Sequence, residues 1–256
     1  MMKSTIAIAL VALSIFNASV DAQLPSASTA ALGMGDNFTA AARGYHAIAW
    51  NPALLGLTGN PGSSLTIAPV RIVSGLDPVS MGDLADFSGT IVDSETKSSW
   101  LSSVRSEGSE EGSAAGDLTY LAAQVGRFGL QVSSRVTAVA DLSPGAVQFL
   151  LFGNAGQTGE PEAIDIGGSS FDAMASSTIA ASYAVPFRTV SGSISVGATI
   201  KYTMGHLLAL ARDDGSRVTA EPLIDVRFPM VGTVDTTDFE FNNGSGIGLD
   251  IGVAMQ

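Results

Sequence analysis

The most constraining feature of this sequence is the alternation of apolar and polar side chains over unusually long stretches. Between residues 193 and 211, apolar side chains occupy nearly every second position, and small or polar side chains lie between them. Successive side chains of a β-strand point to opposite faces, so this pattern predicts a strand with one apolar and one polar face. The stretch far exceeds the about 5 to 6 residues that are commonest for strands of globular proteins.

The same alternation recurs along the chain. Clear cases begin at Phe128, Ile179, Ile194 and Ile247, and weaker ones cover residues 65–72 and 118–126. A charged tip at residues 212–216 has the Asp-Gly chemistry of a turn. We expect the apolar row before this tip to continue through Leu208 and Leu210. The return strand after the tip places these apolar side chains on one face: Val218, Ala220, Ile224, Val226 and Phe228. The pattern predicts about seven strands and almost no long helix.

The N-terminus has the layout of a secretory signal peptide. Lys3 precedes an apolar run at residues 6–16, and small residues follow at positions 20–22. The run is shorter than the about 20 residues that span a bilayer as a helix. We therefore expect residues 1–22 to be a cleaved export signal, with Gln23 as the first mature residue.

Composition excludes several classes of function. Only 14% of the residues are charged and the net charge is -12, which disfavours nucleic acid as a partner. The absence of cysteine excludes disulfides and thiol catalysis. No nucleotide, metalloprotease or serine-hydrolase motif occurs, so we expect no enzyme, no catalytic residue, no cofactor and no metal. The acidic loop at 74–117 matches no calcium-loop spacing, and we expect a solvated loop with short helices near 83–87 and 98–104.

Alternation alone allows either a soluble sandwich with inward apolar rows or a membrane barrel with outward ones. Strand length favours the barrel, as do the charged side chains among small ones on the polar faces. These charged side chains are Arg135, Lys201, Glu221, Asp225, Arg227 and Asp250. Short turns near 126–127 and 188–191 also contrast with long loops at 74–117 and 141–170, as in outer-membrane barrels.

We therefore predict an all-β fold, an antiparallel transmembrane up-and-down barrel with about seven strands present in residues 61–256. Seven is an odd number, and residue 256 falls inside a well-patterned strand. Bacterial barrels close with an even number of strands. We expect the wall to be incomplete at the C-terminus, with the chain an N-terminal fragment of a larger barrel.

Residues 32–55 read as a flexible glycine-containing start, a small-residue helix and a sharp restart. The helix would pack closely through Ala40, Ala41, Ala42 and Ala47. Asn51 has the right side chain to cap the next helical turn, and Pro52 fits its first position because no donor is needed there.

The Gly33-x-Gly35 start, the Ala-rich helix and Trp50-Asn51-Pro52-Ala53 resemble the N-terminal hatch of FadL-type barrels. That group includes long-chain fatty acid transporters and the PorV-type proteins of a secretion system. Residues 150–155 and 197–202 are similar to segments of uncharacterised barrels of the same group. The resemblance implies an outer-membrane barrel of about 14 strands, plugged by residues 23–60. It implies a structural or gating role in this plug for Gly33, Gly35, Trp50, Asn51, Pro52 and Ala53.

An apolar cluster within loop 141–170 is a candidate point of ligand access, or else packs against the barrel rim. It consists of Val147, Phe149, Leu150, Leu151 and Phe152. Our first hypothesis is an outer-membrane barrel, surrounded by lipid, that passes or holds hydrophobic small molecules. The second is a PorV-like anchor or shuttle that binds secretion-system or surface-attachment proteins. The third is a soluble secreted β-sandwich with a binding role.

Overall fold

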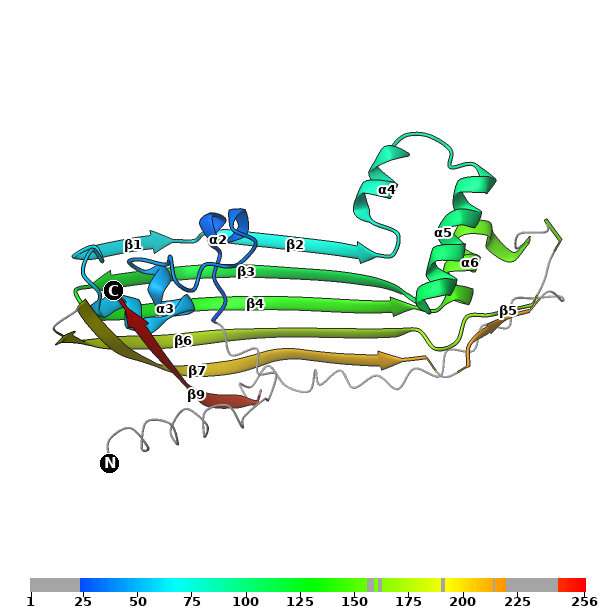
Figure 1. The fold of residues 1–256 in the computed structure, drawn as a ribbon. Helices are drawn as coiled ribbons and strands as arrows, with labels where there is room; N and C mark the ends of the chain where they lie inside the picture. The colour runs from blue at the N-terminus through cyan, green and yellow to red at the C-terminus, as the bar shows by residue number, and fades with distance from the viewer. Residues whose placement is uncertain (1–23, 156–158, 161–162, 190–191, 214, 220–243) are drawn as a thin grey trace, which may run out of the picture.

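The structure, a computed structural model, describes residues 24–155, 159–160, 163–189, 192–213, 215–219 and 244–256. It is mostly antiparallel β-sheet, in agreement with the predicted all-β class. Figure 1 shows one long sheet with a helical segment at each end. The predicted signal peptide and residues 220–228 of the predicted return strand lie outside the described residues.

The main sheet has seven strands, of which four are very long. β1 (Ser63–Ile67) and β2 (Val70–Asp77) pair one after the other along β3 (Glu110–Val125). The sheet continues through β4 (Phe128–Leu142), β6 (Ser170–Thr189), β7 (Gly192–Arg212) and β9 (Ser245–Met255). The strands β3, β4, β6 and β7 have 16, 15, 20 and 21 residues. β7 confirms the length predicted for residues 193–211, whereas β3 is longer than the predicted 118–126.

Long and short connections lie at opposite ends of the sheet, as predicted. The two residues Gly126 and Arg127 join β3 to β4. The far end carries α4 (Met81–Asp86), α5 (Ser94–Glu107), α6 (Pro144–Phe152) and η2 (Gly153–Ala155). The predicted loop at 74–117 was too long, because β2 continues to Asp77 and β3 begins at Glu110. The pairing of these weakly patterned residues with their neighbours decides their conformation.

The described residues test the predicted hairpin at residue 218 alone, because most of the predicted return strand lies outside them. Among the described residues, β7 lies between β6 and β9, and β9 pairs with it from Ile194 to Met204. Val218, the first residue of the predicted return strand, lies instead in the short β8 (Arg217–Val218), which pairs with β5 (Ile164–Asp165). At the tip the Asp213 N–H donates to the carbonyl of Ser169 at 2.8 Å, and the Ile166 N–H donates to the carbonyl of Ser216 at 3.0 Å. The tip therefore lies against the connection that follows α6.

A bulge in β7 changes which side chains share a face. Ser176 pairs with Gly205 but Ala175 pairs with Leu207, so His206 is an extra residue. Paired residues of antiparallel strands point to the same face, and an extra residue reverses the alternation beyond it. Leu207 therefore continues the apolar row, and the prediction that Leu208 and Leu210 do so was wrong. Tyr120 is the corresponding extra residue in β3.

Residues 24–60, which we call the plug, lie on one face of the sheet near the short turns (Figure 1). They contain α2 (Thr29–Gly33), α3 (His46–Trp50) and η1 (Pro52–Gly56). Of the predicted small-residue helix, Ala47 lies in α3, but the prediction was wrong for residues 40–42, because residues 39–45 form turns and irregular chain. The side chain of Asn60 accepts from the Gly44 N–H at 2.8 Å and that of Ser64 from the Tyr45 N–H at 2.7 Å. These contacts hold the backbone in a turn.

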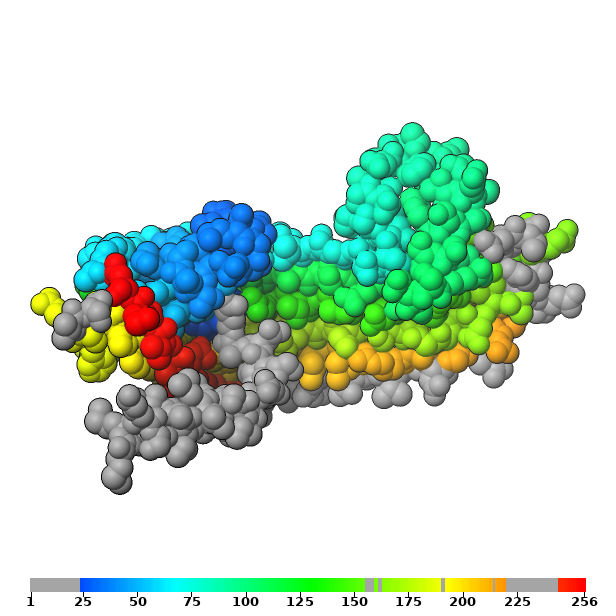
Figure 2. All heavy atoms as spheres, in the orientation of Figure 1, coloured from blue at the N-terminus to red at the C-terminus, as the bar shows by residue number. Residues whose placement is uncertain are grey.

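The main apolar core lies between the plug and the sheet. Plug residues Leu54 and Leu55 are buried there beside Ala184 of β6. A separate cluster joins Val79, Leu101, Val104 and Val147 at the far end of the sheet. Figure 2 shows the plug as a block on one end of the sheet, with a stretch of strand between it and the helices of the far end.

Candidate functional site: the plug and the wall

The two faces of the sheet differ sharply in polarity and burial. We call the face that carries the plug the inner face and the opposite one the outer face. Ser195 and Thr199 point to the inner face and are fully buried, whereas Ile251 on the outer face is 70% exposed. The exposed apolar residues of the outer face include Leu65, Ile67, Phe128, Leu130, Ile179, Val185, Val196, Ile200, Ile247, Leu249, Ile251, Val253 and Met255. The apolar rows thus lie on the uncovered side, and the small polar rows lie under the plug.

We call the seven-stranded main sheet the wall. Its glycines allow the backbone of the plug to approach closely. A Cβ atom added to Gly197 would lie 2.3 Å from the backbone nitrogen of Ala53 and 2.3 Å from the carbonyl carbon of Pro52. A Cβ atom at Gly129 would lie 2.4 Å from a side-chain carbon of Ile48. Real Cβ contacts essentially never fall below 3.0 Å. The plug and the wall are therefore fitted to each other at β4 and β7.

Asn51 and Pro52 do what their sequence pattern predicts. The Asn51 Oδ1 accepts from the Ala53 N–H at 3.0 Å, and Pro52 is at the start of η1. A cap of this kind stabilises a helix by about 0.5–2 kcal/mol. The Asn51 side chain also donates to the Val253 carbonyl at 3.3 Å, so it joins the plug to β9. Ala53 is fully buried against this joint.

The other predicted plug residues form its own internal structure. Gly33 is the last residue of α2, and Gly35 has a φ of 59°, which glycine adopts without strain. Both are exposed. The Trp50 indole N–H donates to the Ser26 hydroxyl at 3.3 Å, and its ring meets Phe38 edge-on at 5.7 Å between centroids. These contacts place Trp50 as a support for the start of the plug.

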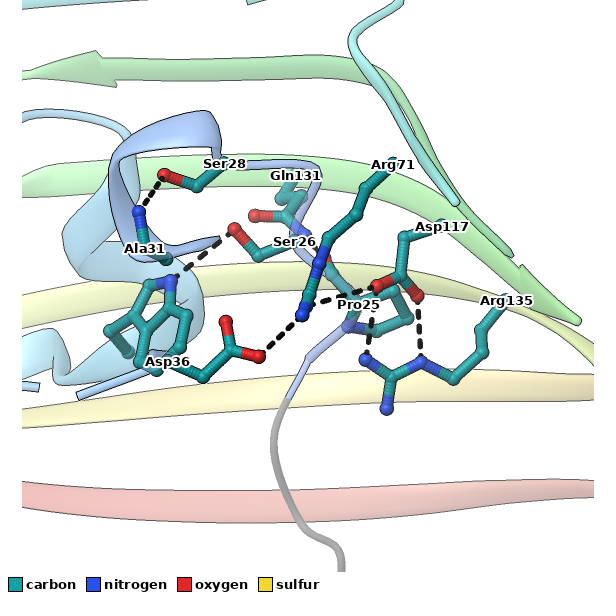
Figure 3. Close-up of polar contacts among 10 residues, drawn as sticks. Pro25, Ser26, Ser28, Ala31, Asp36, Arg71, Asp117, Gln131 and Arg135 are labelled. Atoms are coloured by element: carbon teal, nitrogen blue, oxygen red, sulfur yellow. Dashed lines mark hydrogen bonds and ion pairs between the residues drawn. The ribbon is translucent and has the colours of Figure 1, made fainter. Parts of the chain in front are cut away.

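A chain of charged side chains ties the plug to three strands (Figure 3). Asp117 of β3 is buried, and its carboxylate pairs with Arg135 of β4 at 2.7 Å. Arg71 of β2 lies 3.9 Å from the same carboxylate and also pairs with Asp36 of the plug. Nearby, the Gln131 side chain donates to the Pro25 carbonyl at 2.6 Å.

These contacts differ in strength because they differ in burial. Removing Asp117 would leave the adjacent guanidinium groups without their shared partner, and breaking a buried pair in this way costs about 3–5 kcal/mol. The Asp36 side chain is 44% exposed, so its pair with Arg71 contributes about 1 kcal/mol or less. The charged chain is thus strong within the wall and weak where it reaches the plug.

The alternation of the sequence does not by itself predict this charged chain. Asp117 falls at the end of the predicted acidic loop 74–117, and no pattern marks Asp36 or Arg71. The usable signal was a pair of opposite charges on the polar faces of neighbouring strands. The same signal appears in Lys201 and Asp250, which were placed on the polar faces and pair at 2.8 Å.

His46 is a partly buried ionisable group of the plug. Its ring packs against Tyr45 at 4.1 Å and edge-on against Phe38 at 5.5 Å between centroids. Burial lowers the pKa of His46 from its ordinary value of 6.5. Its Nδ1 atom is buried and has no hydrogen-bond partner among the described residues. The structure therefore favours a neutral ring.

The predicted ligand-access residues divide into two groups on α6. Val147, Leu151 and Phe152 pack in the far-end cluster with α5. Phe149 and Leu150 instead line a pocket of about 440 Å³ with Ala140, Phe171 and Ala211. Ala140, Phe171 and Ala211 are paired neighbours on the outer face of β4, β6 and β7. The pocket therefore opens on the apolar side of the wall, and its lining is almost entirely apolar.

Within the described part of the chain, no cluster of three or more acidic or histidine side chains is placed to hold a metal ion. No helix of the described residues is long and apolar enough to cross a membrane.

Comparison with known proteins places the wall in a family. No curated protein and no solved structure matches the chain. The family of unknown function DUF5723 matches residues 73–256, from β2 through β9. The match covers well over half of the chain, and the protein therefore belongs to the DUF5723 family.

Proposed function

We propose that this chain forms part of the wall of an outer-membrane β-barrel, closed by its own plug, that passes or holds hydrophobic small molecules. The observation that carries the proposal is the inverted polarity of the sheet. Apolar rows are exposed over the outer face, while hydroxyl and amide side chains are buried under the plug. Exposed apolar area costs about 25 cal/mol per Å² in water, and this cost disappears in lipid.

The dimensions of the sheet support the same placement. A transmembrane strand needs about 9–11 residues when it is tilted by about 45°. The strands β3, β4, β6 and β7 all exceed this length. The charged pairs of Asp117 and Asp250 lie on the inner face, away from the surface assigned to lipid.

The handling of hydrophobic molecules rests on the pocket and on the attachment of the plug. The pocket beside Phe149 and Leu150 opens on the lipid side near the far end of the sheet. The plug is attached to β9 by few polar contacts, among them Asn51 with Val253, and to β2 by the exposed pair of Asp36 with Arg71. A molecule bound at the pocket would enter the interior of the barrel only if these contacts between plug and sheet broke.

A second candidate is the PorV-like anchor or shuttle. It is favoured by the position of α4 and α5, which extend beyond the sheet at its far end (Figure 2). This segment carries Asp83, Asp86, Asp93, Glu95 and Glu107. An acidic surface in that position suits a protein partner better than an anionic ligand.

The test begins with location. The full-length gene is expressed with its own N-terminus, and membranes are fractionated and analysed by gel migration with and without boiling. We expect extraction by detergent only and migration that changes on heating. Release by buffer alone, without a heat shift, would contradict the membrane placement and favour a soluble secreted protein.

The second step measures uptake of a fluorescent long-chain alkyl probe by cells that lack their own transporter. Uptake above that of the empty vector supports passage, and retention of the probe by the purified protein supports holding. If neither occurs while secretion or surface-attachment proteins co-purify with the chain, the anchor hypothesis replaces the first.

A further inference from the structure

The outer face is interrupted by one row of polar side chains. Tyr120, Ser134, Ser177 and His206 lie side by side on β3, β4, β6 and β7. The Ser134 hydroxyl contacts the Tyr120 hydroxyl at 3.1 Å and that of Ser177 at 2.5 Å. The His206 Nε2 atom lies 2.7 Å from the Ser177 hydroxyl. Tyr120 and His206 are the two extra residues that make the bulges.

The hydrogens of this row run in one direction. Ser134 donates to Tyr120, and since a hydroxyl has one hydrogen, Ser134 must accept from Ser177. Ser177 in turn must accept from the N–H at Nε2 of His206. The row thus ends in the O–H donor of Tyr120 and, on the neutral ring, in the Nδ1 acceptor of His206. Among the described residues, neither of these end groups has a partner.

The proposed membrane placement, on which this inference rests, puts the row inside the lipid layer. Ser134 follows Phe128 by six positions, or about 20 Å at ~3.3 Å per residue. A strand tilt of about 40° leaves about 15 Å of height, which is less than the about 25 Å of the lipid-facing band. Neither water nor headgroups at this depth would satisfy the two end groups.

We infer that the row is a contact site for a second copy of this chain, related by a two-fold axis along the membrane normal. Two copies inserted in the same direction carry the row at the same depth. When they face each other, the order of strands is reversed, so that β3 of each copy faces β7 of the other. The free donor of Tyr120 then meets the free acceptor of His206 at both ends of the row. The row is complementary to itself.

The shape of this surface fits the same occupant. The side chains in the middle of the row are short serines, and those at its ends are a tyrosine and a histidine. Two convex walls touch at the middle and diverge at the sides. Short side chains in the middle and long side chains at the ends of the row fit this separation. Toward the far end, small residues lie on the outer face next to the row beside Val136 and Leu207, namely Gly116, Ala138, Ala173, Ala175 and Ala209. Small residues let two membrane-embedded surfaces approach closely.

The pairing predicts a specific cross-link, and the chain has no cysteine of its own. Chains carrying Tyr120→Cys and chains carrying His206→Cys are expressed together with different tags and oxidised in their own membranes. We expect a mixed disulfide dimer that contains both tags. Each variant expressed alone should give little dimer, because the two-fold axis keeps identical positions apart. Three strand spacings, about 14 Å, also separate the two positions within one chain, too far for an internal disulfide.

The control replaces His206→Cys by Leu249→Cys, which is exposed on β9 of the same face. The inference is overturned if the mixed dimer is absent, or if Tyr120→Cys alone or with the control links equally well. An independent measurement avoids new cysteines: Ser177→Ala should reduce the dimer fraction of the detergent-extracted chain, and Ser74→Ala, on the same face of β2, should not. An equal effect of both, or of neither, also contradicts it. Heat-shift assays of the same membranes report separately on the membrane placement.

Discussion

The fit of plug to wall predicts a large effect from a single methyl group at Gly197. In Gly197→Ala the new Cβ would lie 2.3 Å from the plug backbone, whereas ordinary contact begins at 3.4 Å. The neighbours are the carbonyl of Pro52 and the nitrogen of Ala53, which are backbone atoms and have no rotamer to change. The plug must therefore move away from β7 by about 1 Å, since overpacked groups are relieved by backbone shifts.

This displacement sets the size of the effect. Overpacking of this kind costs about 1–3 kcal/mol. The bond from Asn51 to the Val253 carbonyl is already 3.3 Å long and would be lost, which adds about 1 kcal/mol. We expect a total loss of about 2–4 kcal/mol in the free energy that holds the plug. Gly246→Ala on the neighbouring β9 meets nothing within 4 Å and should change that free energy by less than about 0.5 kcal/mol.

The fluorescence of Trp50 provides the assay. The chain has two tryptophans, and a Trp100→Phe background leaves only the one in the plug. Urea is raised on the detergent-embedded or bilayer-embedded protein, and the shift of the emission to longer wavelength marks release of the plug. The urea midpoint should fall for Gly197→Ala and stay unchanged for Gly246→Ala. Equal midpoints in both variants would show that the plug is not seated against β7 as described.

Three further predictions use the same assay or a binding assay. Asp117→Asn should lower the free energy of unfolding by about 3–5 kcal/mol. Asp36→Asn should lower it by about 1 kcal/mol or less, and this smaller loss should depend on salt. Similar losses in both variants would contradict the difference in burial. Burial lowers the pKa of His46 below 6.5, so the unfolded plug binds a proton more readily than the folded plug. The stability that is present above about pH 6.5 should therefore decline as the pH falls through the pKa of the folded state. The urea midpoint should therefore drop between about pH 7.5 and 5.5, and His46→Asn should abolish that drop. Ala211→Phe should fill the pocket and reduce binding of an alkyl dye, while Ala198→Phe on the same strand should leave binding unchanged.

The long strands could be predicted from sequence because their pattern is local. Alternation from Phe128 onward and from Ile194 onward defines two faces without knowledge of any neighbour. The cap formed by Asn51 and Pro52 is likewise a local contact over a few residues. Features of this kind depend on backbone geometry that each segment specifies by itself.

Features that depend on pairing could not be predicted in the same way. The first part of β3 is rich in glycine, alanine and acids, which have weak strand propensity, and its place between β2 and β4 decides its conformation. The bulge at His206 is defined only by the register with β6, so the face of Leu208 was assigned wrongly. The partner of Asp117 was hidden for the same reason, since the charge pair exists only once β3 and β4 are aligned.

The two faces of the wall place different demands on the same alternating sequence. The inner face must admit a plug, so it carries glycine at positions such as Gly129 and Gly197 and hydroxyls that bond to each other, as Ser182 does with Thr199 at 2.6 Å. The outer face carries no plug, so its large apolar side chains are free to be chosen for the surrounding medium. A polar row on that face therefore calls for an external reason, because internal packing supplies none for Tyr120 and His206. A bulge lies at each end of this row, and each bulge adds one polar side chain to the outer face while the neighbouring strands stay paired.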